Sequence, residues 1–331
     1  MFRRTVIALL SVTPLFLAGA VPWVAAAATS TTSASSPRLH GSASASTAPV
    51  PKSHVAPPLA GTGTWWHPSA APMRWQWELD HVFDPTNPTD LGLNDTLPNG
   101  AAAAAPTVYD IDAIENTAAT VAAIHQRGAK AICYIEVGTA GDYYTVAQEG
   151  TTTTTYFQRF QAAGVLGAAL SGYPENFLNI AAPATTTILE QMIKRQCAMK
   201  GFDAVETDLD ETYSGSDGPT GFSLTRAEEM TFLTGLATYM HSLGMAWIIK
   251  NPDDTGDNFA QKMEPIADAV LTEQCNEYST CSQLQWYVGK KAVFNAEYNL
   301  DTSSFCGADA AMGFNGVAFN QNLDGTQSPC R

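Results

Sequence analysis

The chain has 331 residues, of which 45% are hydrophobic and 15% charged, and its net charge is −15. This length suits one large domain or two ordinary ones, and the apolar content excludes a chain that is disordered throughout. No second long apolar run follows the N-terminal one, which excludes a multi-span membrane protein. Residues 1–60 hold four basic residues and no acidic one, so residues 61–331 hold 13 basic and 32 acidic residues, a net charge of −19. Such an acidic chain repels nucleic acids and attracts polycations.

Residues 1–28 have the pattern of a secretory signal peptide. Arg3 and Arg4 precede an apolar stretch from Thr5 to Val24, which ends in the small residues Ala25–Ala28. The alternative is a membrane anchor, because the stretch approaches the length that spans a bilayer. Two prolines and the alanine run favour cleavage. We therefore expect a secreted, extracellular protein without stable membrane insertion after the signal is removed.

Residues 29–63 are mostly Ser, Thr, Ala and Pro. This composition is typical of a disordered linker, because it offers almost nothing from which to build a core. The remaining segment, residues 64–331, is close in length to the ~250 residues of a typical (β/α)8 barrel. We expect it to be a single domain and a monomer.

Six cysteines in an exported chain favour three disulfides, for which fifteen pairings are possible. We favour Cys275–Cys281 and Cys306–Cys330 because the partners are close in sequence, which leaves Cys133–Cys197. The sequence has no C-x-x-C, H-x-H or H-E-x-x-H motif. We therefore expect no metal site and no cofactor.

Short β-rich apolar runs alternate with helical patterns along the domain, which is typical of βαβ units and a parallel sheet. One helical pattern covers residues 117–127 and is followed by Gly128, a residue type that ends helices. Another begins at the capping box Thr225–Glu228 and runs to Gly244. The candidate strands are residues 73–77, 107–112, 130–136, 176–180, 202–208, 245–250, 268–273, 291–297 and 314–319.

These nine candidate strands are one more than a closed barrel needs. We therefore expect an α/β fold, a single-domain (β/α)8 TIM barrel, in which one candidate is an extra strand or no strand. The competing architecture is a doubly wound open sheet. It usually has a glycine-rich first turn, whereas the near match Gly61–Gly63 lacks the third glycine and precedes every candidate strand.

Acidic residues lie at or directly after the C-terminal ends of most candidate strands. In (β/α)8 barrels the active site forms at the C-terminal strand ends, so these side chains are expected to meet at one mouth. Any single one could instead be a helix cap or part of an ion pair. Their repetition, with few basic residues nearby, favours a site in which one acid is held protonated beside an ionised one. The acids are Asp110, Asp112, Glu136, Glu206, Asp208, Asp210, Glu273 and Glu297, and Lys250–Asn251 ends the sixth candidate.

Paired carboxylates beside an open cleft perform glycoside hydrolysis, in which one protonates the leaving oxygen and the other attacks or activates water. Aromatic residues near the strand ends could stack on sugar rings. For each of them the alternative is core packing, which for Trp75 and Trp77 means filling the barrel. The aromatic residues are Trp65, Trp66, Trp75, Trp77, Tyr109, Tyr213, Tyr278 and Tyr298.

Other chemistries have weaker support. No G-x-S-x-G motif indicates the serine of an α/β-hydrolase. The segment from Asp210 begins like an EF-hand calcium loop, but its twelfth position is Gly221 where the loop needs Glu. Asp208 and Asp210 could ligate Mg²⁺, although no phosphate-binding loop accompanies them.

Five segments together resemble glycoside hydrolase family 114. Gly201–Asp208 is similar to the family's GFDGVE signature and the PD that follows it. The other segments are Tyr109–Asp112, Ala131–Ile135, Thr272–Cys275 and Ala296–Tyr298. The family comprises TIM-barrel endo-α-1,4-polygalactosaminidases, so the resemblance implies hydrolysis of α-1,4-linked galactosamine in a partly N-acetylated exopolysaccharide. A deacetylated polymer of this kind is cationic, which agrees with the acidity of the chain.

The resemblance implies Asp208 and Glu273 as the catalytic pair of a retaining enzyme, and we assign Asp208 as nucleophile and Glu273 as acid/base. For Glu206 the alternative is a buried ion pair with Lys250. The alternative functions are a carbohydrate-binding barrel without catalysis, serving as matrix lectin or adhesin, and a hydrolase of another α-glycan. The residues expected to bind substrate are Trp75, Gln76, Trp77, Asp110, Asp112, Glu136, Glu206, Asp210, Tyr213, Lys250, Asn251, Glu297 and Tyr298.

Overall fold

A computed structural model describes residues 64–142 and 154–331, all of which belong to one unit of the chain. The predicted signal peptide (1–28) and linker (29–63) lie outside the described residues. Within the described part of the chain, no helix is both long and apolar enough to cross a membrane.

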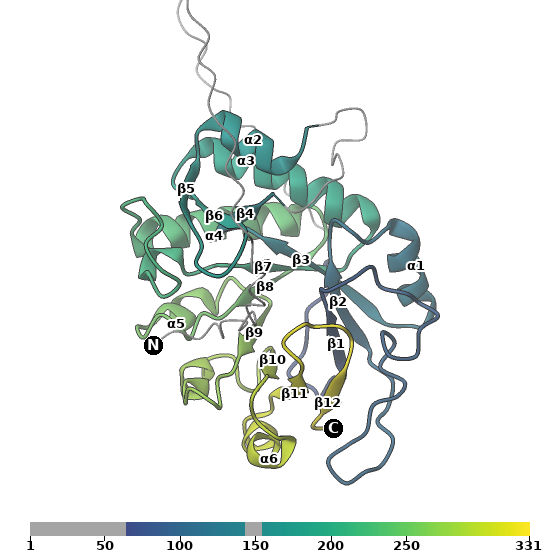
Figure 1. Ribbon diagram of the computed structural model, residues 1–331. Helices are drawn as coiled ribbons and strands as arrows, with labels where there is room; N and C mark the ends of the chain where they lie inside the picture. Colours follow the sequence, from purple (N-terminus) through teal and green to yellow (C-terminus); the bar gives the residue numbers. More distant parts are fainter. Residues whose placement is uncertain (1–63, 143–153) are drawn as a thin grey trace, which may run out of the picture. The chain divides into compact units, whose positions relative to one another are not determined.

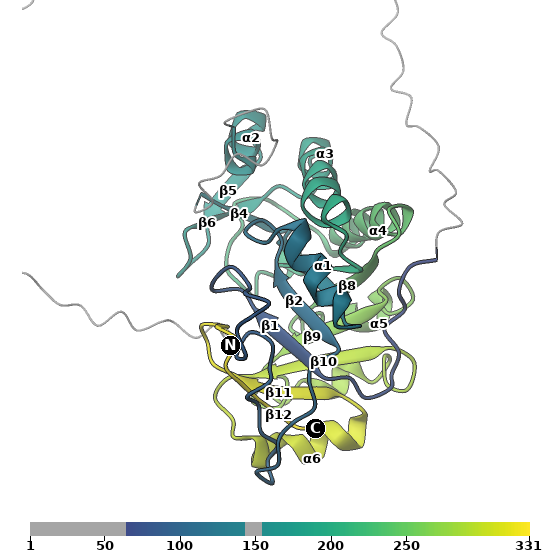
Figure 2. The same cartoon turned by 90° about the vertical axis from the view of Figure 1, so that its right-hand side faces the viewer.

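The main sheet has nine strands, of which eight are parallel and follow one another in chain order (Figures 1 and 2). This confirms the predicted (β/α)8 barrel. Eight of the nine candidate strands are therefore barrel strands. The strands are β1 (Trp75–Glu78), β2 (Val108–Asp112), β3 (Lys130–Glu136), β7 (Ala204–Asp208), β8 (Ala246–Lys250), β9 (Ala269–Glu273), β10 (Ala292–Glu297) and β11 (Asn315–Phe319).

The barrel closes between β1 and β11 through isolated contacts, and the two strands are not neighbours in the described sheet. Trp75 Nε1 donates to the Asn315 carbonyl at 2.8 Å. Beyond the strand ends, Leu79 N donates to the Leu323 carbonyl at 3.0 Å, and Glu78 forms a single β-bridge with Asp324. We call this contact between the end of β1 and residues 320–325 the seam. A short strand, β12 (Gln327–Pro329), runs antiparallel to β11 beside it.

The helices lie outside the sheet (Figure 2). The predicted helix at 117–127 is α1, with Thr117 as its N-cap and Gly128 in the left-handed conformation (φ +77°) just beyond its end. The predicted capping box begins α4, where Thr225 and Glu228 exchange side-chain and backbone hydrogen bonds. The helices are α1 (Ala118–Gln126), α2 (Tyr156–Ala163), α3 (Pro183–Met192), α4 (Arg226–Ser242), α5 (Phe259–Met263) and α6 (Thr302–Met312).

The ninth candidate strand, 176–180, belongs to a separate small sheet. This sheet pairs β4 (Thr139–Gly141), β6 (Glu175–Leu178) and β5 (Leu166–Ala169) in antiparallel fashion. It lies with α2 in the connection from β3 to β7 (Figure 1). The candidate is thus an extra strand, which is one of the two outcomes expected from the count of nine.

Alternation along the strands separates two hydrophobic clusters. One fills the barrel and includes Trp75, Trp77, Phe294 and Phe319, whose rings meet edge to face or at a tilt. The larger cluster lies between the sheet and the helices. Because successive strand residues point to opposite faces, neighbouring residues of one strand enter different clusters and alternate residues enter the same one. This decides which strand-end charges face the barrel axis.

Three disulfides are present, and they are the three pairings favoured from the sequence. Cys133–Cys197 joins β3 to the turn after α3, Cys275–Cys281 closes the loop after β9, and Cys306–Cys330 ties α6 to the C-terminal residues. Each closes a loop and so restricts the unfolded chain.

Candidate active site

Lys250 bridges the two predicted catalytic carboxylates. The three residues end β7, β8 and β9, which are neighbours in the sheet, so their side chains emerge side by side at the C-terminal mouth. Lys250 Nζ lies 3.3 Å from Asp208 Oδ2 and 3.2 Å from Glu273 Oε2. Because both oxygens contact one nitrogen, the distance between them cannot exceed the sum of these two distances. The sequence-predicted pair is therefore brought together.

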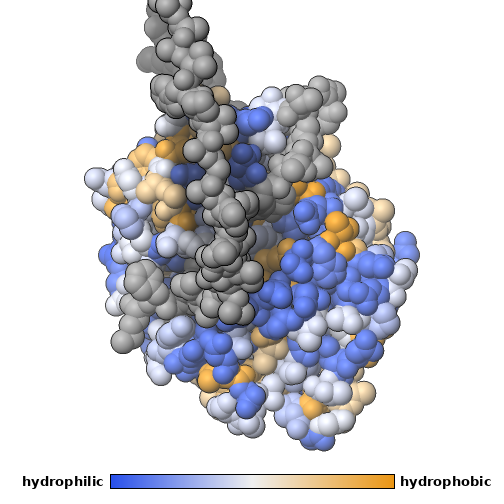
Figure 3. Space-filling view, viewed as in Figure 1, coloured by the Kyte–Doolittle hydropathy of each residue, from blue (hydrophilic) through white to orange (hydrophobic). Residues whose placement is uncertain are grey.

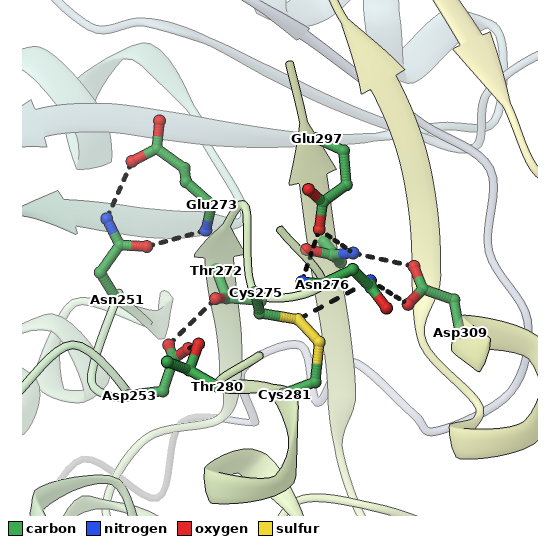
Figure 4. Close-up of a disulfide and its surroundings, with 11 residues drawn as sticks. Asn251, Asp253, Thr272, Glu273, Cys275, Asn276, Thr280, Cys281, Glu297 and Asp309 are labelled. Carbon is green, nitrogen blue, oxygen red and sulfur yellow. Dashed lines mark hydrogen bonds between the residues drawn. A yellow bond between two sulfur atoms is a disulfide. The ribbon is translucent and has the colours of Figure 1, made fainter. Parts of the chain in front are cut away.

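Glu273 is held as a carboxylate. Tyr298 Oη donates to Oε1, and Asn251 Nδ2 donates to Oε2 at 2.8 Å. Asn251 also accepts from the Glu273 backbone N–H through Oδ1 at 2.8 Å (Figure 4). Burial raises the pKa of Glu273, but the positive charge of Lys250 and these two hydrogen bonds outweigh it and lower the pKa below its ordinary value.

Asp208 is positioned by a residue that sequence reasoning did not select. Tyr134 Oη donates to Asp208 Oδ2 at 2.7 Å, and the Leu209 backbone N–H donates to Oδ1 at 2.8 Å. Tyr134 lies on β3, two residues after Ile132, which packs inside the barrel. Alternation along β3 was the available signal, because it places Tyr134 on the inner face.

The chain turns sharply after each of these three strand ends. Leu209, Asn251 and Gln274, which directly follow Asp208, Lys250 and Glu273, have φ of +60°, +48° and +58°. Non-glycine residues rarely adopt this left-handed conformation, which costs of order 1 kcal/mol or more and is concentrated at functional sites. The backbone thus stores strain at the positions that aim the three side chains.

Below Lys250, two buried carboxyl groups face each other. Asp110 on β2 and Glu206 on β7 are both fully buried. Within the described part of the chain, none of the four carboxyl oxygens has a hydrogen-bond partner. Burial is the main cause that raises the pKa of Asp110 to about 7 and that of Glu206 well above its ordinary value.

This carboxyl pair is the floor of the site. Lys250 Nζ lies 3.8 Å from Glu206 Oε1, so the alternative of an ion pair for Glu206 has a contact in the structure. Lys250 Nζ also lies 4.7 Å from the centre of the Trp77 ring, a cation–π distance. One lysine is thus surrounded by carboxyl groups and an aromatic face.

Several residues predicted to bind substrate lie elsewhere. Trp75 packs in the barrel core, and Gln76 Nε2 donates to the backbone carbonyls of Thr89 and Gly325 on the outer side of β1. Glu297 turns away from the barrel axis toward Asn276, whose side chain binds Asp309 of α6 (Figure 4). Their substrate-binding roles remain predictions.

Two of the predicted acids, Asp112 at the end of β2 and Asp210 in the loop after β7, accept hydrogen bonds from backbone N–H groups. Asp112 Oδ1 accepts from the N–H groups of Ile114 and Glu115, both at 2.7 Å. Asp210 Oδ2 accepts from the Lys250 N–H at 3.0 Å and from a threonine hydroxyl. Asp210 therefore holds the backbone at the last residue of β8, Lys250.

Two further predicted residues lie at the edge. Glu136 lines a hollow between β4 and α2 together with Tyr156 and Phe160. The hydroxyl of Tyr213 donates to Asp257 at 3.1 Å, and its ring packs against Phe259.

Hydrophilic residues predominate on the coloured part of the face in Figure 3, where apolar residues form only small separate patches. That surface suits a polar ligand better than an apolar one.

These features define a class: a (β/α)8 barrel with a close carboxylate pair at its C-terminal mouth has the equipment of a glycoside hydrolase. The chain belongs to glycoside hydrolase family GH114, whose family model matches residues 55–331. This confirms the resemblance to the polygalactosaminidase family seen in the sequence. No curated protein matches the sequence.

Solved structures agree with this fold. The structure of Ega3 from Aspergillus fumigatus, in complex with galactosamine, has a TM-score of 0.63 at 24% identity over 81% of this chain and 99% of that chain. The glycoside hydrolase domain of PelA from Pseudomonas aeruginosa has a TM-score of 0.51 at 13% identity over 77% of this chain and 97% of that chain.

Proposed function

We propose that this enzyme hydrolyses α-1,4-linked galactosamine in a cationic, partly N-acetylated exopolysaccharide, with retention of configuration. The observation that carries the proposal is the Lys250-bridged pair of Asp208 and Glu273 in a GH114 chain. The excess of 19 negative charges over residues 61–331 supports a polycationic substrate. The related Ega3 structure contains galactosamine.

The short separation of the pair supports retention. Retaining enzymes hold their carboxyl groups about 5–5.5 Å apart, whereas inverting enzymes leave roughly 6.5–9.5 Å for a water molecule. The two Lys250-facing oxygens lie 3.3 and 3.2 Å from the same nitrogen, so even a straight line through that nitrogen only reaches the lower limit of the inverting range. Any bend at the nitrogen brings the oxygens closer, which favours the shorter class. Asp208 would attack the anomeric carbon and form a glycosyl ester, while Glu273 protonates the departing oxygen.

The charges around Glu273 suit its change of role between the two steps. The negative charge of Asp208 raises the pKa of Glu273, whereas Lys250 lowers it. When Asp208 becomes an ester its charge is lost, so the pKa of Glu273 falls further and the group can act as base toward water. The lowered starting value predicts that catalysis is favoured at acidic pH, where a larger fraction of Glu273 carries the proton that the first step needs.

The test is release of reducing ends from partly deacetylated galactosaminogalactan by the full chain, with Asp208→Asn and Glu273→Gln. We expect a loss above about 100-fold in both variants and normal activity in Asp301→Asn, a change at an exposed helix end. The anomeric form of the first product, followed by NMR, tests retention. Binding without release would support the lectin, and neither binding nor release would exclude this polymer.

We also propose export, with removal of residues 1–28, a tether formed by residues 29–63, and a monomeric enzyme. Three disulfides among the described residues support an oxidising, extracellular location. N-terminal sequencing of the protein from culture medium tests cleavage, and light scattering tests the oligomeric state. A cell-retained chain in which the predicted signal peptide is still present would contradict the proposal.

A further inference from the structure

A second cluster of ionisable side chains lies at the seam, outside the barrel axis. Glu78 ends β1, and His81 and Asp90 follow in the connection to β2. His81 Nε2 lies 3.1 Å from Glu78 Oε1 and 3.4 Å from Asp90 Oδ2, and the three ligand atoms all lie within 4.8 Å of one another. We call these three residues the seam triad. Their spacing, Glu-x2-His-x8-Asp, matches none of the metal motifs considered in the sequence.

Glu78 is the unusual member of the triad. Its side chain is fully buried, yet among the described residues neither carboxylate oxygen accepts a hydrogen bond. Gly325 leaves room for it, since a Cβ at that position would come within 3.2 Å of Glu78 Oε2. Two further carboxylate residues, Asp90 and Asp324, are its neighbours. A buried carboxyl group that accepts no hydrogen bond in the described part of the chain, and that lies beside a second carboxylate and an imidazole, is a favourable ligand for a cation.

The other two residues of the triad, Asp90 and His81, also have ligand atoms near Glu78. Asp90 is held by the Asp84 backbone N–H, which donates to Oδ2 at 2.8 Å, and by the side chain of Asn87. Such supporting hydrogen bonds are the outer contacts that fix metal ligands. His81 is 41% exposed and forms the open side of the triad, through which an ion could enter from solvent.

We propose that the seam triad binds a zinc-type divalent transition metal through Glu78 Oε1, His81 Nε2 and Asp90 Oδ2. Zinc bonds of about 2.0–2.2 Å in a tetrahedron place neighbouring ligand atoms roughly 3.3 Å apart. The two separations from His81, 3.1 and 3.4 Å, lie on either side of this value. A water molecule completes the tetrahedron on the exposed side. Calcium fits less well, because it prefers six to eight oxygen ligands.

The site would have a structural role. It joins the end of β1 to the β1–β2 connection at the place where the barrel closes through isolated contacts. It directly follows Trp77, whose ring lies below Lys250. Metal at the triad would therefore stabilise barrel closure and hold one wall of the active site.

The test uses the full chain after dialysis against EDTA, with zinc chloride added in competition with a fluorescent chelator. We expect one zinc ion whose affinity falls at least ~100-fold in His81→Ala, since even loss of an outer partner costs 10–100-fold. His67→Ala is the matched control: His67 is also exposed and lies 3.4 Å from a carboxylate, that of Asp268. This control should bind zinc as the parent does.

A second variant keeps the test independent of folding. Glu78→Gln retains size and removes the charge, so we expect a folded protein that no longer gains thermal stability from zinc. Zinc-dependent stabilisation should be present in the parent and the His67→Ala control. The proposal is overturned if the parent takes up no zinc, if His81→Ala binds it equally well, or if calcium binds and zinc does not. If no metal binds, the triad is only a contact between His81 and two carboxylates.

Discussion

Replacing Lys250 by Met is expected to shift the pH–activity profile of this enzyme to higher pH. The ammonium group lies 3.2 Å from Glu273 and 3.3 Å from Asp208. At an effective dielectric constant of about 20, a charge pair at this distance interacts by about 5 kcal/mol. Solvation and relaxation reduce such effects, and measured shifts beside a cation are about 1–3 units. Without the cation, the pKa values of both carboxyl groups rise.

The assay is kcat/KM against pH, which reports the free enzyme's essential groups. In our assignment the acidic limb follows ionisation of Asp208 and the basic limb follows deprotonation of Glu273. Both limbs should move up by about 1–3 pH units in Lys250→Met, with a lower maximum. Lys130→Met is the control. Lys130 is the first residue of β3, at the end of the strand away from the active-site mouth, and its Nζ lies 2.6 Å from Asp203. This variant should leave the profile unchanged. An unmoved profile in Lys250→Met would refute the electrostatic reasoning.

Three further outcomes are expected. Tyr134→Phe removes the hydroxyl that donates to Asp208 Oδ2. We expect kcat/KM to fall about 10-fold and only the acidic limb of the pH profile to move to higher pH. An equal shift of both limbs would contradict this role. Burial raises the pKa of Glu229 to about 8, so the native state keeps a proton that the unfolded state releases and stability falls as pH rises from about 4.5 to 8. Glu229→Gln should therefore raise the free energy of unfolding by about 1–2 kcal/mol at pH 8 and not at pH 4, measured in urea; equal effects at both pH values would contradict the titration. Replacing Cys306 and Cys330 together by Ser opens a 24-residue loop and should cost about 3 kcal/mol in the same assay, and a loss below about 1 kcal/mol would show that the disulfide is dispensable.

The sequence was sufficient for the barrel because its signals are local. Alternating apolar runs, helix caps and cysteine spacing each depend on neighbouring residues, and the barrel strands and capped helices formed where those signals lie. The segment 176–180 shows the limit. Its apolar run has the same character as a barrel strand, and only its antiparallel partners in the small sheet distinguish it. Pairing partners are a tertiary property, which a single apolar run does not contain.

The candidate site was less predictable because a strand-end acid has more than one use. Asp112 and Asp210 follow strands as the catalytic candidates do, but their carboxylates accept hydrogen bonds from backbone N–H groups at 2.7 to 3.0 Å. Unpaired N–H groups at strand ends need acceptors, and a nearby aspartate provides one. Composition alone does not separate an acid that completes the backbone from one that faces the substrate.

Strand alternation does separate some of them. On β7, Ala204 packs inside the barrel, so Glu206 and Asp208, two and four residues later, point the same way. On β10, Ala296 packs inside, and its neighbour Glu297 must therefore face the helices, where it accepts from the Asn276 backbone N–H at 2.8 Å. Tyr298, one residue further, returns to the inner face and donates to Glu273. Each side chain at the barrel mouth thus has its direction set by the apolar residues that precede it, and the same rule applied to β3 selects Tyr134.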